Sequence, residues 1–261
     1  MVDYYIGTMG FSYRDWVSSF YPNMMTARDF LPYYGSIFNA VEIDSTFYGI
    51  PKREAVLRWR DSTPDNFKIC VKVPRSITHE AGLINTSLEM DRFFETIKHL
   101  DEKLGAIIFQ FPPSYTADQF DTANQFLGEL PKDYDFAIEF RHRSWYTAQT
   151  TKMLKAHNVC WVATEFEGVP KNVDLTTEMV LIRFIGQHGR FKRHDEEQID
   201  VAAQLSWWQQ WIQSQSDHVH TVYGFFNDDY SGHAPGTANR FKNILGLPVV
   251  NKEQPKQMRL F

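Results

Sequence analysis

Short runs of β-branched and aromatic residues recur along the whole sequence, separated by roughly thirty residues each. Between most of these runs the apolar residues follow helical spacing. The pattern is clearest in LEMDRFFETIKHL, where one face carries Met90, Phe93, Phe94, Ile97 and Leu100. Strands that alternate with helices form a parallel sheet covered by those helices. The alternation therefore predicts an α/β fold.

The number of strands predicted is eight, which is the number in a TIM-type barrel. The runs are YYIGT from Tyr4, AVEIDSTF from Ala40, FKICVKV from Phe67, AIIFQF from Ala106, FAIEFRH from Phe136, VCWVATE from Val159, VLIRFIG from Val180 and VYGFFND from Val222. Further helices are expected over Arg53 to Asp61, Ala117 to Leu130, Thr150 to His157, Glu196 to Ser216 and Thr237 to Leu245. The segment 166–179 shows little helical signal.

Eight repeating units favour one closed (β/α)8 barrel over an open doubly wound sheet, which more often has a glycine-rich first turn. The sequence has no GxGxxG or P-loop pattern, so no nucleotide cofactor is expected. We expect the barrel to occupy residues 1–246. A short flexible tail, LPVVNKEQPKQMRLF, follows over residues 247–261, because its two prolines and its polar residues interrupt regular structure.

Composition narrows the class of protein. A net charge of -5 and a pI near 6.0 disfavour indiscriminate nucleic-acid binding but leave room for a local basic pocket. The N-terminus lacks a signal-peptide pattern, and no apolar run of 18 residues occurs, so we expect a cytoplasmic protein with no membrane partner. Cys70 and Cys160 lie in predicted strands without CxxC spacing, which indicates two buried thiols.

The stretch VEIDSTFYG places carboxylates in an otherwise apolar strand. Val41 and Ile43 would face the surrounding helices, so Glu42 and Asp44 would face the barrel interior and its C-terminal mouth, where TIM barrels carry their active sites. The same alternation directs further polar side chains to that mouth. These are Lys72, Gln110, Glu139, Arg141, Arg183 and Asn227.

These residue types predict a site for an anion. Lys72, Arg75, Arg141 and Arg183 could bind the oxygens of a phosphate or carboxylate. The candidate catalytic residues, which would act as acid, base or divalent-metal ligands, are Glu42, Asp44, Lys72 and Glu139. The alternative is an internal ion-pair network, such as Glu42 with Lys72 or Glu139 with Arg183, that only satisfies the centre of the barrel.

Loop residues after the strands add further candidates. His79, His142 and His233 would either contact the ligand or cap their loops. Gly232 and Gly236 precede the helix expected at Thr237, where free backbone amides bind anions, although turning alone also explains them. The tryptophans at 207, 208 and 211 indicate a helix packing against the barrel, with a sugar-stacking or partner surface as the alternative.

The chain resembles the YecE-like family, a domain of unknown function related in fold to sugar isomerases. The resemblance rests on GTMGFSYRDWVSSFYP at Gly7, FNAVEIDSTFYGIP at Phe38, FKICVKVPRSITH at Phe67, FQFPPSY at Phe109, EFRHRSW at Glu139 and FFNDDYSGHAPGTANRF at Phe225. It implies a TIM-type barrel but no established reaction. The shared polar positions that it implies are Tyr13, Trp16, Glu42, Lys72, Glu139, Arg141, Arg183 and Asn227.

Two stretches depart from the family's pattern. The seventh strand reads RFIG where R-x-H-G is common, and the eighth reads NDD where paired asparagines are common. The first departure argues against a histidine base from the seventh strand.

The last five residues, QMRLF, fit the Q-x-x-L-F pattern by which bacterial proteins dock on the DNA sliding clamp. Leu260 and Phe261 would anchor in an apolar pocket and Gln257 would bond at its rim, or the two apolar residues would pack back onto the barrel. Three functions follow from these patterns. They are an enzyme of phosphodiester or DNA-linked chemistry, a sugar or sugar-phosphate isomerase or hydrolase, and a non-enzymatic ligand-binding or clamp-associated scaffold.

Overall fold

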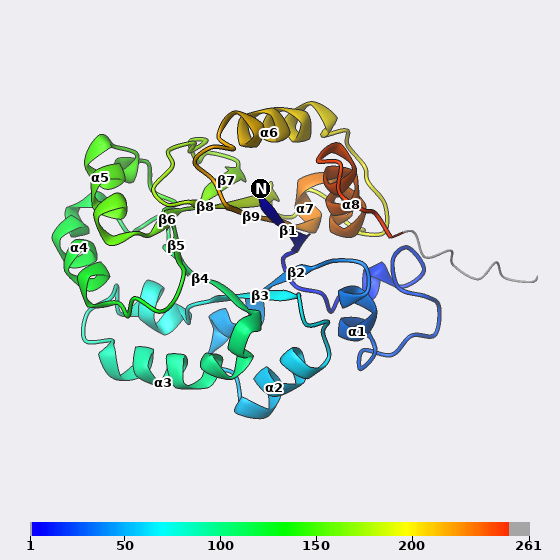
Figure 1. The fold of residues 1–261 in the computed structure, drawn as a ribbon, viewed down its shortest axis with the longest axis horizontal. Helices are drawn as coiled ribbons and strands as arrows, with labels where there is room; N and C mark the ends of the chain where they lie inside the picture. The colour runs from blue at the N-terminus through cyan, green and yellow to red at the C-terminus, as the bar shows by residue number, and fades with distance from the viewer. Residues whose placement is uncertain (1, 251–261) are drawn as a thin grey trace, which may run out of the picture.

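The computed structural model describes residues 2–250 and consists of parallel strands surrounded by helices (Figure 1). Every strand pairing is parallel. The strands are β1 (Asp3–Thr8), β2 (Ala40–Ile43), β3 (Lys68–Lys72), β4 (Leu104–Gln110), β5 (Phe136–Glu139), β6 (Cys160–Trp161), β7 (Ala163–Phe166), β8 (Met179–Gly186) and β9 (Thr221–Phe226). The predicted sixth strand is divided into β6 and β7, between which lies Val162.

Hydrogen bonds connect these strands into two sheets, in the orders β1-β9-β8-β7 and β2-β3-β4-β5-β6. The sheets meet where Met9, just after β1, bridges to Glu42 of β2, and where β6 continues into β7. Around the molecule the strands therefore follow the order of a (β/α)8 barrel, with an incomplete hydrogen-bond ladder at these two meeting points. The predicted α/β fold with TIM-type strand order is confirmed.

The helices lie outside the strands (Figure 1). They are α1 (Phe30–Gly35), α2 (Arg53–Asp61), α3 (Ser87–Ile97), α4 (Phe120–Glu129), α5 (Ala148–His157), α6 (Ala202–Ser214), α7 (Asp228–Ser231) and α8 (Ala234–Ile244). Short 3-10 turns cover Arg14–Trp16, Asp44–Tyr48, Lys98–Lys103, Ala117–Gln119 and Arg143–Trp145, and a π-helical turn covers Ser76–Glu80.

Two predicted helix starts are wrong. The helix expected from Glu196 begins at Ala202, because the preceding residues form a loop on the mouth side of the barrel. The helix expected from Thr237 begins at Ala234, where Pro235 suits the first turn since its missing N–H is not needed there. Gly236 therefore lies inside α8 and not, as predicted, in the turn that precedes the helix.

The core has two layers, and strand alternation assigns residues to them. Val41 and Ile43 pack outward in the layer between strands and helices, as predicted. The inner layer combines small side chains, such as Ala106, Cys70 and Cys160, with larger ones such as Tyr223 and Phe225. Both cysteines are buried and free, which confirms the prediction.

Among the tryptophans of α6, Trp208 is fully buried, which confirms packing against the barrel, whereas Trp207 stays 40% exposed. Within residues 2–250, no helix has the length and apolar character that a membrane crossing requires.

Candidate functional site at the mouth of the barrel

A buried polar contact in the interior joins Arg183 of β8 to Glu42 of β2. Arg183 donates from Nε to Oε2 at 2.9 Å and from Nη2 to Oε1 at 2.7 Å, which is bidentate geometry. Glu42 is 0% and Arg183 2% exposed. Burial raises the pKa of Glu42 to about 7, although the nearby guanidinium acts to lower it.

A second carboxylate shares the same guanidinium. Arg183 Nη1 donates to Glu139, and Arg141 Nε donates to the other oxygen of Glu139 at 2.8 Å. Burial alone would raise the pKa of Glu139, but the two guanidinium groups lower it to about 2. The two glutamates therefore have opposite titration behaviour. Glu139 keeps its charge, whereas Glu42 accepts a proton near neutral pH.

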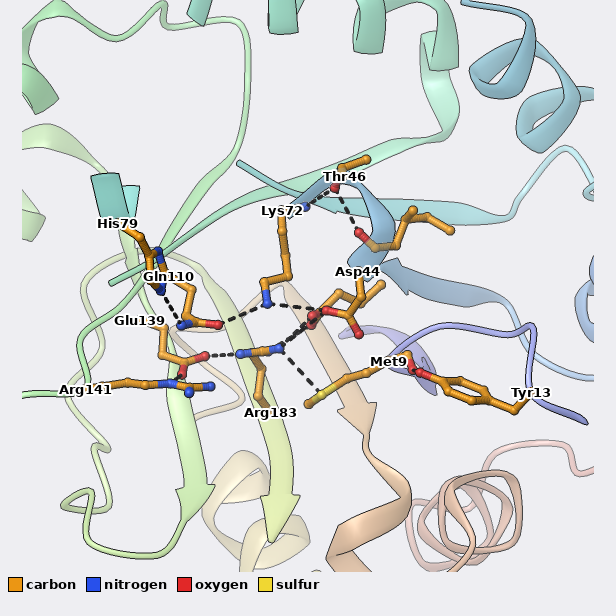
Figure 2. Close-up of polar contacts among 12 residues, drawn as sticks. Met9, Tyr13, Asp44, Thr46, Lys72, His79, Gln110, Glu139, Arg141 and Arg183 are labelled. Carbon is orange, nitrogen blue, oxygen red and sulfur yellow. Dashed lines mark hydrogen bonds and ion pairs between the residues drawn. The ribbon is translucent and has the colours of Figure 1, made fainter. Parts of the chain in front are cut away.

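A polar layer above this network is built from the ends of β2, β3 and β4. Lys72 Nζ donates to Gln110 Oε1 at 3.0 Å and forms an ion pair with Asp44 at 3.4 Å. Thr46 fixes the turn that carries Asp44, because its hydroxyl accepts from the Lys72 backbone at 3.0 Å and donates to the Ile43 carbonyl at 2.9 Å (Figure 2). Burial, followed by the charge of Arg183, lowers the pKa of Lys72.

These pairs show which part of the internal-network alternative is correct. The pair predicted between Glu139 and Arg183 is present. Glu42, however, pairs with Arg183, and Lys72 pairs with Asp44. The buried glutamates thus position arginines, while the side chains in front of them face a cavity.

The cavity at the mouth of the barrel has a volume of about 560 Å³. It is lined by Met9, Tyr13, Asp44, Phe47, Tyr48, Lys72, Arg75, His79, Gln110, Arg141, Arg183, Ile185, His188 and Asn227. Four of these carry positive charge and only Asp44 is acidic, so the lining favours an anion. Burial and the charge of Lys72 lower the pKa of His79, which keeps its imidazole neutral near pH 7.

Arg141 has the geometry of an anion clamp. Its Nε is bound to Glu139, and its guanidinium lies 5.0 Å from the centre of the Phe166 ring, which together fix its orientation. Its side chain is only 16% exposed. Neither Nη1 nor Nη2 donates a hydrogen bond to any residue in the range 2–250. This pair of nitrogens matches two oxygens of a phosphate or carboxylate.

Most of the predicted site residues line this cavity, some of them only at its edge. Arg75 is about half exposed and pairs with Glu80. Tyr13 donates its hydroxyl to the Met9 carbonyl at 2.8 Å. Asn227 caps α7, because its Oδ1 accepts from the Asp229 backbone at 3.0 Å.

The cavity lining does not include Glu42 and Glu139, which lie beneath it, or three further predicted residues. Trp16 is fully buried and donates its indole N–H to Asp228 at 3.0 Å, so it is a packing residue. His142 caps its own loop, accepting from the Ser144 backbone at 3.2 Å. His233 is 8% exposed and precedes α8, and burial lowers its pKa to about 4. Loop capping and packing explain these three residues. They lie outside the strands, so strand alternation does not predict the direction of their side chains.

Sequence reasoning missed Phe47, Tyr48 and His188. Phe47 packs under the Lys72 ammonium, 4.5 Å from its ring centre, and Tyr48 is 77% exposed at the rim. All three lie beyond strand ends, where strand alternation gives no direction. Their position directly after β2 and β8 was the available signal, because TIM barrels build their sites from such loops.

A divalent metal would need several carboxylate or imidazole ligands converging on one point. Within residues 2–250 no group of three His, Cys, Asp or Glu side chains has that arrangement. Glu42 and Glu139 bind guanidinium groups instead. The QMRLF motif with Gln257, Leu260 and Phe261 lies outside the described residues.

The chain is similar to proteins of one family along nearly its whole length. The sequence profile described as "Protein of unknown function DUF72" matches residues 5–259. UPF0759 protein YunF of Bacillus subtilis is 27% identical and is aligned over 98% of this chain and 99% of its own length. UPF0759 protein YecE of Escherichia coli K12 is 31% identical over 142 residues, 54% of this chain, and the chain spans about half (50%) of that relative's length.

Solved structures agree with this relationship. A DUF72 family protein from Thermotoga maritima superimposes with a TM-score of 0.79 at 27% identity, covering 94% of this chain and 99% of the other. One from Enterococcus faecalis gives a TM-score of 0.76 at 23% identity, covering 95% and 99%, and supports the fold alone. The family profile covers nearly all of the sequence, and the cavity lies within the matched region. The chain therefore belongs to the DUF72 family of proteins of unknown function.

Proposed function

We propose that this protein is an enzyme that binds a small phosphate-bearing anion in the cavity at the mouth of its barrel. The observation that carries the proposal is the free guanidinium edge of Arg141, whose Nη1 and Nη2 donate to no residue within 2–250. A charged donor pair held in one orientation at 16% exposure matches a bidentate oxygen ligand. Lys72 lies in the same cavity and supplies a second cation.

Proton transfer is assigned to Asp44 and Lys72. The sequence placed it also on Glu42 and Glu139, but both of these are fully engaged by guanidinium groups beneath the cavity. Asp44 is 31% exposed and faces the ligand space, and its partner Lys72 has a lowered pKa. Burial makes Lys72 give up its proton more readily, and a lysine with this property is suited to moving a proton between substrate atoms.

The size of the cavity favours a small-molecule substrate over a nucleic-acid duplex. About 560 Å³ accommodates a molecule of metabolite size, and Lys72, Arg141 and Arg183 lie inside the mouth with little exposure to solvent. A sugar phosphate fits this description, with its phosphate at Arg141 and Lys72 and its hydroxyl groups at Asp44 and Gln110. A phosphodiester remains the second substrate class, because the same cations would bind its single negative charge.

The test is a turnover screen with phosphorylated sugars and a chromogenic phosphodiester. Proton exchange with deuterated solvent reports isomerase chemistry, and release of the leaving group reports hydrolysis. We expect turnover with the wild type, at least a tenfold loss in Arg141→Gln and Asp44→Asn, and no loss in Arg53→Gln, whose exposed arginine begins α2. Equal turnover in Arg141→Gln and the wild type would refute the assignment of the anion site.

A further inference from the structure

A histidine that sequence reasoning overlooked lies at the rim of this cavity and faces a carboxylate from the helix α7. His188 follows β8, and its side chain is 58% exposed. Its Nδ1 lies 3.4 Å from Oδ2 of Asp229 in α7. His188 lines the cavity, whereas Asp229 is 14% exposed behind it. The imidazole therefore has Nδ1 toward a carboxylate, while Nε2 has no hydrogen-bond partner among residues 2–250.

The local backbone is built to bring the two residues together. Gly186 ends β8 with φ of 75°, and a Cβ there would stand 2.2 Å from the Asp229 carbonyl oxygen. Only glycine permits this approach of strand to helix. Gly189 then donates its backbone N–H to Asp229 Oδ2 at 3.1 Å, and Asn227 Oδ1 accepts from the Asp229 backbone at 3.0 Å. Gly189 thus holds the carboxylate directly, whereas Asn227 holds the backbone that carries it.

One aromatic ring connects this pair to the proposed anion clamp. The His188 ring lies 5.4 Å from the Phe166 ring, and the Arg141 guanidinium lies 5.0 Å from the same ring. Phe166 ends β7, between the strand that precedes Arg141 and the strand that precedes His188 in barrel order. Arg141 and His188 also line the same cavity, so an anion held by Arg141 would occupy the space that His188 borders.

We infer that His188 is a proton-accepting residue of this cavity and that Asp229 is its positioning residue. The carboxylate can only accept a hydrogen bond, so it selects the tautomer with the proton on Nδ1. The Nε2 lone pair is then free to take a proton from a bound ligand. The resulting imidazolium keeps its Nδ1–H on Asp229, which stabilises the positive charge. The catalytic part of this inference rests on the proposed function, whereas the tautomer does not.

The experiment is nitrogen NMR of the full chain labelled on its histidine rings. We expect pyrrole-type Nδ1 and pyridine-type Nε2 resonances for His188 in the neutral state, assigned by their loss in His188→Gln. His142 is an internal control with the opposite tautomer, since its Nδ1 accepts a hydrogen bond from the Ser144 backbone. In Asp229→Asn the Nδ1–H preference of His188 should disappear while the His142 signals stay unchanged.

Inorganic phosphate is the probe that separates this inference from the proposed function. A shift of the His188 Nε2 resonance on adding phosphate supports both. The expected tautomer with no phosphate response supports the pairing of His188 with Asp229 and counts against the anion site. An Nε2–H tautomer of His188, or one that Asp229→Asn leaves unchanged, would overturn the inference whatever phosphate does.

Discussion

Arg183 holds Glu42 through two hydrogen bonds, although β8 and β2 are not neighbours in either sheet. The contact crosses the barrel interior, and the third nitrogen of the same guanidinium holds Glu139 of β5. One positive charge thus connects three strands. This arrangement fixes Glu139, which in turn orients Arg141 toward the cavity. The buried ion pairs therefore contribute to the site by fixing the orientation of Arg141, whose guanidinium faces the cavity.

Replacing Arg183 with leucine should destabilise the fold by about 3 to 5 kcal/mol, because the buried Glu42 loses its guanidinium partner and Glu139 loses one of its two. Chemical denaturation measures the free energy of unfolding. The matched control is Lys98→Gln, which removes an exposed ion pair with Glu95 and should cost below about 1 kcal/mol. A loss from Arg183→Leu as small as that of the control would contradict the view that this charge organises the interior.

The two buried glutamates predict opposite pH effects on stability. The folded pKa of Glu42, about 7, lies above its usual value of 4.5, so the native state binds the extra proton and stability falls as pH rises between these values. The folded pKa of Glu139 is about 2, so its contribution is lost as pH falls from 4.5 toward 2.

Denaturation midpoints measured from pH 2 to pH 8 test these signs. In Glu42→Gln the decline in stability between pH 4.5 and 7 should flatten, whereas the loss below pH 4.5 should persist. A pKa shift as large as that of Glu42 changes the free energy of unfolding by about 3 kcal/mol across that interval. An unchanged profile in Glu42→Gln would show that another group titrates there.

Replacing Lys72 with methionine should separate binding from folding. Its partner Asp44 is 31% exposed and can be solvated once the lysine is gone, so we expect a loss of stability smaller than that of Arg183→Leu. Phosphate affinity should fall at least tenfold because one of the two proposed ligand cations is removed. Denaturation and titration calorimetry on the same preparation check both halves. Retained affinity would exclude Lys72 from the anion site.

Replacing Gly186 with alanine should disturb the loop that carries His188. Its φ of 75° is strained for alanine, and the new Cβ would collide with the Asp229 backbone. Gly168 is the matched control, since its φ is 80° but nothing lies within 4 Å of a Cβ there. Gly168→Ala should cost about 1 to 2 kcal/mol. Gly186→Ala should cost measurably more in thermal unfolding, and equal costs would show that the close approach is unimportant.

The sequence predicted the fold and the inner half of the site because both depend on strand alternation. Glu42, Lys72, Gln110, Glu139 and Arg183 all lie in strands, and each faces inward as the alternation requires. Strand alternation could not predict which of these charged side chains form ion pairs with one another. That depends on distances across the barrel, where Glu42 lies with Arg183 and Lys72 with Asp44.

The rim of the site was predicted less well because its residues lie in loops. His142 and His188 both follow a strand closely, yet His142 folds back to cap its own turn and His188 faces the cavity. Their backbones decide this, and in particular the positive φ of Gly186, which no hydrophobic pattern encodes. The late start of α6 has a similar origin, because the residues before Ala202 form a loop at the mouth.

The most direct test of the anion site is calorimetric titration of inorganic phosphate into the wild type and into Arg141→Gln, with Arg53→Gln as the control. We predict saturable binding to the wild type and the control, and at least a tenfold weaker affinity in Arg141→Gln, whose free guanidinium edge is lost. Equal affinity in all three proteins, or no binding to the wild type, would contradict the proposal that Arg141 clamps a phosphate at the mouth of the barrel.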